Sequence, residues 1–220
     1  MKYGFIKVAS AVPSVKVADC VQNTKEMEVI IAQAEGRGVE IIVFPELSVT
    51  GYTCQDLFRE QLLLDAAENS VMALLDFTRQ LDIICIVGAP VVAGGLLLNC
   101  GIVLQKGKIL GIVPKTYLPN YNEFYEQRWF SSGFDDLPSS LDISGKKVAF
   151  GRELVFETHN YKFGVELCED LWSPNPPSVN MSLNGAEIIL NLSASNELIG
   201  KSDYRRELVK QQSARCICGY

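Results

Sequence analysis

Residues 164–172 read Gly-Val-Glu-Leu-Cys-Glu-Asp-Leu-Trp, an apolar run that ends in a cysteine and an acidic turn. The run predicts a strand, and the turn places Cys168 where that strand ends. A catalytic nucleophile needs such a fixed and exposed corner between a strand and a helix. The adjacent Glu169 and Asp170 are expected to raise the thiol pKa rather than lower it. A reactive Cys168 would therefore need a base and a cation from elsewhere in the chain.

Strand-like and helix-like segments alternate on both sides of this corner. Helical periodicity and a leading Pro-Pro pair predict helices over 17–34, 61–81, 177–184 and 202–215. Apolar runs predict strands over 3–11, 39–44, 83–91 and 186–192, and hairpins over 96–113 and 154–167. The alternation indicates a layered α/β fold, and the hairpins predict a mixed sheet. Because no repeat or linker interrupts the pattern, residues 1–220 are predicted to form one domain.

Two segments fall outside this alternation. Residues 114–137 show no clean period and are rich in Tyr, Phe, Trp, Asn and Glu, as in a functional loop. Residues 216–220 read like the opening of another strand, which predicts that the domain is incomplete at its C-terminus.

The composition is that of a soluble globular protein, with 48% hydrophobic and 21% charged residues and a net charge of -6. The acidic balance argues against nucleic acid or a membrane as partner, since no basic stripe could hold phosphates and no apolar run approaches the ~20 residues of a membrane span. The start lacks a signal-peptide pattern, and the seven cysteines have no regular spacing, which favours the cytoplasm. A single histidine and no Cys-x-x-Cys pair predict that there is no metal site.

Two polar residues could supply the base and the cation that Cys168 needs. Glu46 directly follows the predicted strand 39–44, and Lys115 follows the hairpin 96–113. Alone, each has an ordinary explanation, because they could be a surface acid and a solvated lysine, as Cys168 could be a packed thiol. Together they suffice for acyl transfer from an amide, with a carboxylate base, a thiolate nucleophile and an ammonium that stabilises the oxyanion.

The segments around these residues resemble a known superfamily. Phe-Pro-Glu-Leu around Glu46, Pro-Lys-Thr-Tyr-Leu-Pro around Lys115 and Glu-Leu-Cys-Glu-Asp-Leu-Trp around Cys168 are similar to the motifs of the nitrilase (carbon–nitrogen hydrolase) superfamily. Three longer stretches, over 44–58, 115–130 and 191–201, resemble the N-terminal glutaminase domains of glutamine-dependent NAD⁺ synthetases. The resemblance implies a four-layer α-β-β-α sandwich.

The resemblance also implies roles for individual residues. Glu46 would be the general base, Lys115 would stabilise the intermediate and Cys168 would be the nucleophile. The superfamily has a second glutamate shortly after the lysine, for which Glu123 fits the spacing best and Glu126 is the alternative. The groups implied for glutamine binding are Tyr121, Ser195, Lys201 and, through the backbone N–H that would join the oxyanion hole, Glu169.

The implied function is hydrolysis of L-glutamine through a thioester at Cys168, with ammonia passed to a C-terminal synthetase domain. That domain would use ATP, Mg²⁺ and deamido-NAD⁺ to form NAD⁺, whereas no cofactor is expected in residues 1–220. The Ser-Gly-Gly-x-Asp-Ser loop of such a synthetase does not occur in this sequence. A homo-oligomer is expected by resemblance. The alternatives are a stand-alone amidase that acts on another small carboxamide and a catalytically silent interaction module.

Overall fold

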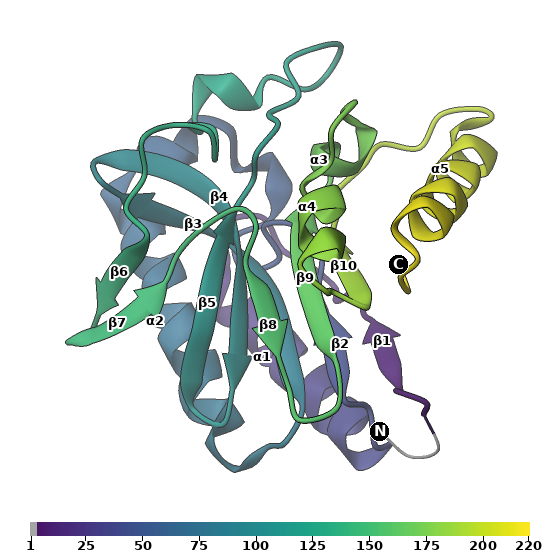
Figure 1. The fold of residues 1–220 in the computed structure, drawn as a ribbon. Coiled ribbons are helices and arrows are strands. Elements are labelled where there is room, and N and C mark those ends of the chain that lie inside the picture. Colours follow the sequence, from purple (N-terminus) through teal and green to yellow (C-terminus); the bar gives the residue numbers. More distant parts are fainter. Residues whose placement is uncertain (1–3) are drawn as a thin grey trace.

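Two β-sheets packed face to face form the centre of the computed structural model, which describes residues 4–220 (Figure 1). The larger sheet has the order β1-β2-β3-β4-β5, formed by Val8–Ser10, Ile41–Val43, Ile84–Ala93, Leu96–Gln105 and Lys108–Pro114. The smaller sheet has the order β10-β9-β8, formed by Ile188–Leu192, Lys162–Leu167 and Val155–Glu157. A separate hairpin pairs β6 (Ser140–Ile143) with β7 (Lys146–Ala149).

Helices cover the outer face of each sheet. The helices α1 (Cys20–Gly36) and α2 (Gln61–Phe77) pack on the larger sheet. On the other side α4 (Pro177–Leu183) packs on β9, with α5 (Lys201–Cys216) beside it (Figure 1). The short helices are η1 (Tyr52–Arg59), η2 (Thr78–Gln80), η3 (Glu126–Arg128) and α3 (Glu169–Trp172). The predicted α-β-β-α sandwich is confirmed.

Side chains of the central strands alternate between two cores. In β2, Ile42 packs under the helices α1 and α2, whereas Ile41 packs against the smaller sheet. In β3, Cys85 faces the helices and Ile86 faces the smaller sheet. Because successive side chains of a strand point to opposite faces, a strand covered on both faces must be apolar throughout. This explains the continuous apolar runs around these two strands.

Strand directions bring several loops to one edge of the sandwich. β2 and β3 are parallel, and the antiparallel pairs β3–β4 and β4–β5 make β5 run in the same direction as β2. In the smaller sheet β9 and β10 are parallel. The loops after β2, β5, β9 and β10 therefore leave from strand ends where ligands bind in layered α/β folds.

A close backbone crossing fixes the corner after β2. A Cβ atom on Gly88 of β3 would lie 2.3 Å from the nitrogen of Leu47 and 2.7 Å from the oxygen of Pro45. The Gly88 carbonyl accepts a hydrogen bond from the Val49 N–H at 3.0 Å. Only glycine leaves room for this crossing, so the corner that carries Glu46 rests directly on β3.

Most predicted elements are confirmed, with shifts of a few residues at their ends. The predicted strand 3–11 is reduced to β1, and residue 3 lies outside the described residues. The predicted helix 61–81 ends at Phe77 and continues as η2. After α5 the chain runs beside β10, where the Ile189 N–H donates to the Gly219 carbonyl at 2.8 Å, as the predicted strand opening required.

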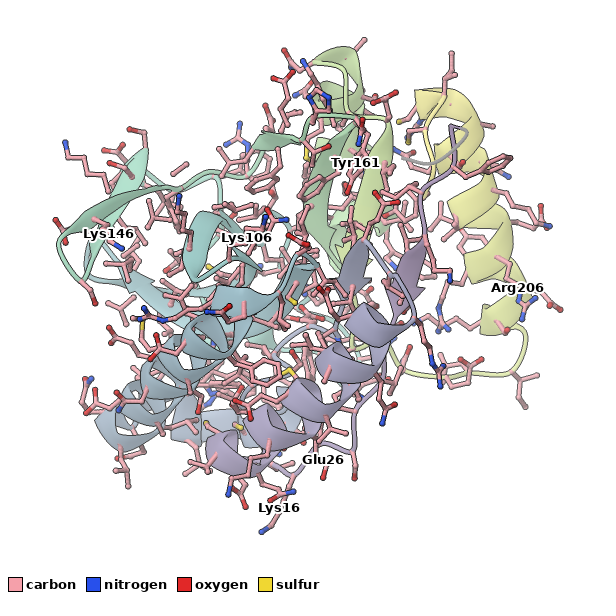
Figure 2. All side chains as sticks on the ribbon, turned by 90° about the horizontal axis from the view of Figure 1, so that it is seen from below. Lys16, Glu26, Lys106, Lys146, Tyr161 and Arg206 are labelled. Carbon is pink, nitrogen blue, oxygen red and sulfur yellow. The ribbon has the colours of Figure 1, made fainter. Side chains whose placement is uncertain are left out.

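Charged side chains such as Lys16, Lys106, Lys146 and Arg206 lie exposed on the outside of the sandwich (Figure 2). Among residues 4–220, no helix combines the length and apolar character needed to cross a membrane. All seven cysteines are free thiols, and Cys85 is fully buried, as predicted.

Candidate active site

Cys168 occupies a sharp corner between β9 and α3. Its backbone has φ 41° and ψ -98°, a conformation that residues other than glycine rarely adopt. The Cys168 N–H donates to the Leu192 carbonyl at 2.8 Å and to Asn191 Oδ1 at 3.0 Å. The predicted corner is present, but it is not exposed, since only 7% of Cys168 is accessible. Strained backbone of this kind is often found at nucleophiles.

A buried ammonium joins two carboxylates beside this corner. Lys115 Nζ donates to Glu46 Oε1 at 2.6 Å and to Glu126 Oε1 at 2.7 Å. Lys115 is 0% exposed, Glu46 is 2% exposed and Glu126 is 1% exposed. Buried charges persist only when they are paired and hydrogen-bonded, so this cluster is a coupled unit and not a set of surface ions.

Two further side chains that the sequence did not indicate complete the cluster. Asn99 of β4 is fully buried, and its Nδ2 donates to Glu46 Oε1 at 2.7 Å. The Tyr52 hydroxyl donates to Glu126 Oε1 at 2.6 Å. The Ala194 N–H, two residues after the end of β10, donates to Glu46 Oε2 at 3.2 Å. Oε1 of Glu46 is therefore held by Asn99 and Lys115, and Oε2 is held by the loop after β10.

The surroundings of Cys168 favour its protonated form. Burial, followed by the negative charge of Glu46, raises the pKa of the Cys168 thiol to about 12. Lys115 acts in the opposite direction, as does the Ser193 hydroxyl, which donates to Cys168 Sγ at 3.3 Å. A raised thiol pKa was expected from the adjacent Glu169 and Asp170, but the carboxylate with the largest effect on it is Glu46.

The neighbouring charges have equally marked shifts. Burial alone lowers the pKa of Lys115, but the charges of Glu46, Cys168 and Glu126 outweigh it, and the pKa is raised. Burial, then repulsion by Glu46, raises the pKa of Glu126 to about 7. Glu126 Oε1 accepts two hydrogen bonds, whereas its buried Oε2 has no partner among the described residues. A proton on Glu126 therefore belongs on Oε2.

Spacing favoured Glu123 over Glu126, but the structure brings Glu126 to Lys115. Glu123 is exposed and accepts a hydrogen bond from Asn196 Nδ2, whereas Glu126 is the carboxylate that contacts Lys115. The reason is local, because η3 begins at Glu126 and turns its side chain inward, while Glu123 lies in the irregular loop before it.

The residues predicted to bind glutamine lie on the outer side of the Glu46–Lys115–Glu126 cluster. The Tyr121 hydroxyl donates to the Glu169 carboxylate at 2.9 Å. Lys201 Nζ donates to Asn196 Oδ1 and lies 5.0 Å from the centre of the Trp172 ring. The Ser195 hydroxyl is half-buried, and its one hydrogen bond among the described residues is a long contact of 3.5 Å to the Asn196 carbonyl.

Asp170 links the cysteine corner to the lysine loop. Its Oδ1 accepts the N–H groups of Thr116 and Tyr117 at 3.0 and 2.8 Å, and its Oδ2 accepts the Leu167 N–H at 3.0 Å. Burial raises the pKa of Asp170 to about 8. The Asp170 carboxylate thus accepts backbone donors on both sides of the site, a role that could not be predicted from sequence beyond shaping the turn.

Open space lies on two sides of α3. A cavity of about 630 Å³ is lined by Tyr121, Glu169 and Trp172, among others. A second cavity, of about 340 Å³, is lined by Cys168, Ser193 and Arg205, among others. The nucleophile corner can therefore be reached from the surface although Cys168 itself is mostly covered.

The sequence matches a known protein family over most of its length. A sequence profile described as carbon-nitrogen hydrolase matches residues 7–216. The chain belongs to the carbon–nitrogen hydrolase family. The recognised superfamily is thereby confirmed, and this hydrolase domain extends over nearly the whole chain.

Relatives of this carbon–nitrogen hydrolase domain are considerably longer. A glutamine-dependent NAD(+) synthetase from Mycobacterium bovis is 36% identical over 222 residues, covering 100% of this chain and 32% of that protein. One from Rattus norvegicus is 36% identical over 191 residues, covering 83% of this chain and 26% of that protein. The chain thus spans about a third or less of the length of these relatives.

Solved structures agree with this assignment. A glutamine-dependent NAD(+) synthetase from Cytophaga hutchinsonii superposes with a TM-score of 0.84 at 29% identity, covering 97% of this chain and 34% of that one. An amidase from Nesterenkonia sp. has a TM-score of 0.77 at 16% identity, covering 97% of this chain and 73% of that one. The second likeness, at this low identity, shows that the two proteins share a fold.

Proposed function

We propose that this carbon–nitrogen hydrolase domain hydrolyses the side-chain amide of L-glutamine through a thioester on Cys168. The observation that carries the proposal is the fully buried Lys115, bonded to both Glu46 and Glu126 beside the Cys168 thiol. Acyl transfer from an amide requires a base, a cation and a nucleophile, and all three lie together in this buried site. The relatives named as glutamine-dependent enzymes support glutamine as the amide.

In the first half-reaction, Glu46 accepts the thiol proton as Sγ of Cys168 attacks the amide carbon. The carbonyl electrons move to oxygen, and the anion is stabilised by Lys115. Lys115 Nζ has three N–H donors, of which two bind carboxylates, so the third is free for this oxygen. The backbone N–H of Glu169 is a second donor, because this residue begins α3 and has no acceptor within the helix.

Collapse of this intermediate breaks the C–N bond and leaves a thioester. The departing nitrogen needs a proton, and Glu126 with its pKa near 7 is suited to donate one from Oε2. Glu46 passes the thiol proton to the now ionised Glu126 through Lys115, which is bonded to both, and is a carboxylate again. Glu46 then deprotonates a water molecule, whose oxygen attacks the thioester carbon. The C–S bond breaks, the thiol regains its proton and glutamate leaves. Only acid–base and acyl chemistry is needed.

Charged side chains near the opening of the site match the α-carboxylate and the α-ammonium of glutamine. Lys201, held by Asn196 and the Trp172 ring, suits the α-carboxylate, and Glu169, held by Tyr121, suits the α-ammonium. The hydroxyl of Ser195 lies in the same loop as Asn196 and can add a hydrogen bond. Contacts of Tyr121, Ser195 and Lys201 with glutamine were expected from resemblance, whereas the pairing of the Glu169 carboxylate with the α-ammonium is proposed from its position beside Tyr121.

The destination of the ammonia belongs to the longer protein. The relatives are about three times the length of this chain, and we assign the remainder of such a protein to a synthetase domain that binds ATP, Mg²⁺ and deamido-NAD⁺ and forms NAD⁺. A homo-oligomeric assembly and a cytoplasmic location belong to the same proposal.

Replacement of the nucleophile tests the proposal directly. Cys168→Ala should abolish glutamine hydrolysis while the melting temperature stays within a few degrees of wild type. A diazoketone analogue of glutamine should add covalently to Cys168 in the wild type, seen as a mass increase on the peptide that contains it. Wild-type turnover by the Ala variant, or labelling at another cysteine alone, would refute the thioester mechanism.

A different small carboxamide is the competing substrate, because an amidase shares this fold. Initial rates with glutamine, asparagine, propionamide and acetamide separate the two possibilities. Glutamine should exceed the other amides in kcat/KM by at least about a hundredfold, since recognition of both α-groups contributes several hydrogen bonds. Comparable values for a simple aliphatic amide would favour the stand-alone amidase.

A further inference from the structure

A chain of hydrogen bonds lies behind Cys168 and is separate from the Glu46–Lys115–Glu126 cluster. Asn191 Oδ1 accepts the Cys168 N–H at 3.0 Å, and Asn191 Nδ2 donates to the Tyr220 hydroxyl oxygen at 3.0 Å. The Tyr220 hydroxyl in turn donates to Glu166 Oε1. The Ser178 N–H of α4 donates to Glu166 Oε2 at 2.9 Å. The chain therefore runs from the nucleophile's backbone to the helical layer.

The path is built from three elements that are distant in sequence. Asn191 of β10 and Glu166 of β9 are direct neighbours in the parallel register. Tyr220 reaches them from the segment after α5, which is held on β10 by hydrogen bonds between Gly219 and the backbone of Glu187 and Ile189. Glu166 is fully buried, so its carboxylate depends on the Tyr220 hydroxyl and the Ser178 N–H for stabilisation.

We infer that Asn191 and Tyr220 are positioning residues that hold the backbone of Cys168 in its reactive conformation. A non-glycine residue at φ 41° persists only where the surrounding structure compels it. Asn191 supplies that constraint, because its amide oxygen binds the Cys168 N–H and its amide nitrogen is itself fixed by Tyr220. The Leu192 carbonyl binds the same N–H from the adjacent strand.

The arrangement also separates two backbone N–H groups by role. The Cys168 N–H is already bound by two acceptors and is not free for the substrate, whereas the Glu169 N–H one residue later has no acceptor within α3. Rotation of the corner would turn the Glu169 N–H away from the oxyanion and Sγ away from Glu46. The network therefore affects the rate of attack more than the affinity for substrate.

Tyr220→Phe in the full-length protein is the first test, since it removes one hydroxyl and little volume. The rate at which iodoacetamide alkylates Cys168, followed by peptide mass spectrometry, should fall about tenfold, the effect of one such hydrogen bond. kcat for glutamine should fall by a similar factor, with KM within about twofold of wild type. Asn191→Leu removes the contact to the Cys168 N–H itself and should lower both rates further.

Tyr161→Phe is the matched control. Tyr161 is a buried tyrosine, whereas Tyr220 is half-buried, and Tyr161 precedes β9, at the end of that strand opposite to Cys168 (Figure 2). Its rates should equal those of wild type. Rates are expressed per folded protein, with the folded fraction taken from thermal unfolding, so that loss of stability alone does not count as loss of positioning.

Wild-type alkylation and kcat in both Tyr220→Phe and Asn191→Leu would overturn the inference, as would an equal loss in Tyr161→Phe. The glutamine readout rests on the proposed function, whereas alkylation does not. If wild type failed to hydrolyse glutamine, the proposed function would fall, and the alkylation ratios would still decide the role of Asn191 and Tyr220.

Discussion

Glu126 lies in an environment unlike that of an exposed glutamate. One carboxylate oxygen accepts hydrogen bonds from Lys115 and Tyr52, while the other is buried without a partner among the described residues. Burial and the charge of Glu46 hold its pKa at about 7. Below that pH Glu126 carries a proton it can donate, and above it the carboxyl is ionised.

The predicted consequence is a falling limb in the pH profile of glutamine hydrolysis. kcat should decline above about pH 7 as the acid form of Glu126 is lost, and Glu126→Gln should remove this limb and lower kcat about a hundredfold. The measurement is kcat from pH 5 to 9 for both proteins, with Glu123→Gln as the control because Glu123 is exposed. An unchanged limb in Glu126→Gln would assign the titration to another group.

Asp170 illustrates a residue whose role is structural. Its two oxygens accept three backbone N–H groups, so asparagine would place an N–H₂ donor against the Leu167 N–H or against those of Thr116 and Tyr117. Asp170→Asn should lower the free energy of unfolding by about 1–3 kcal/mol, the cost of an unsatisfied buried donor.

Thermal unfolding measures this effect, which should appear as a decrease in Tm of several degrees for a domain of this size. Asp65→Asn is the control, since Asp65 is exposed on α2 and accepts a hydrogen bond only from Gln61 among the described residues. A Tm for Asp170→Asn that matched the control would show that the amide is accommodated and that the three N–H contacts contribute little.

At the scale of elements, the crossing of β3 over the corner after β2 determines where the base lies. Gly88→Ala would place a methyl group 2.3 Å from the Leu47 nitrogen, a contact with backbone that cannot move aside cheaply. The variant should lose at least about 1–3 kcal/mol of stability and, in its folded fraction, lower kcat by displacing Glu46.

Gly36→Ala is the control for this substitution. Gly36 ends α1, and a Cβ there meets no atom within 4 Å. Urea unfolding and glutamine kinetics on both variants decide the matter. If Gly88→Ala and Gly36→Ala had the same stability and the same kcat, the backbone of the corner would move aside more easily than its close contacts with Gly88 imply.

The sequence predicted the strands, hairpins and long helices because apolar period and turn residues are local signals. It did not predict η1, where Gln55 at φ 54° interrupts the helical period, or the hairpin of β6 and β7, whose strands are only four residues long and contain one buried residue, Val148. Short exposed strands lack the alternation of a half-buried sheet, so no pattern marked them.

The same limit applies to the site. Glu46, Lys115 and Cys168 stand directly after apolar runs, which made them visible as strand-end residues. Asn99 lies inside a strand, and Tyr52 is one aromatic among many, so nothing local distinguished them. The choice between Glu123 and Glu126 depended on where η3 begins, which spacing cannot give to within three residues.

At the scale of the whole molecule, we expect a longer protein to have two separable activities, release of ammonia from glutamine and formation of NAD⁺. Cys168→Ala should eliminate NAD⁺ formation with glutamine as nitrogen source and leave formation from added ammonium salts close to wild type. The assay is NAD⁺ produced from deamido-NAD⁺ and ATP under each nitrogen source. Loss of both activities in a folded variant would contradict a role for Cys168 confined to ammonia release.

The buried cluster of Lys115 with two carboxylates has a consequence for the end of each catalytic cycle. The substrate is a neutral carboxamide, and it enters a site in which the Lys115 ammonium already forms ion pairs with Glu46 and Glu126. Hydrolysis turns that carboxamide into an anion, and Lys115, the one cation bonded to this cluster among the described residues, is already shared by two carboxylates. The carboxylates of Glu46 and Glu126 repel the new carboxylate and favour release of glutamate. Glutamate should therefore be a weak inhibitor, even when its concentration is well above that of glutamine.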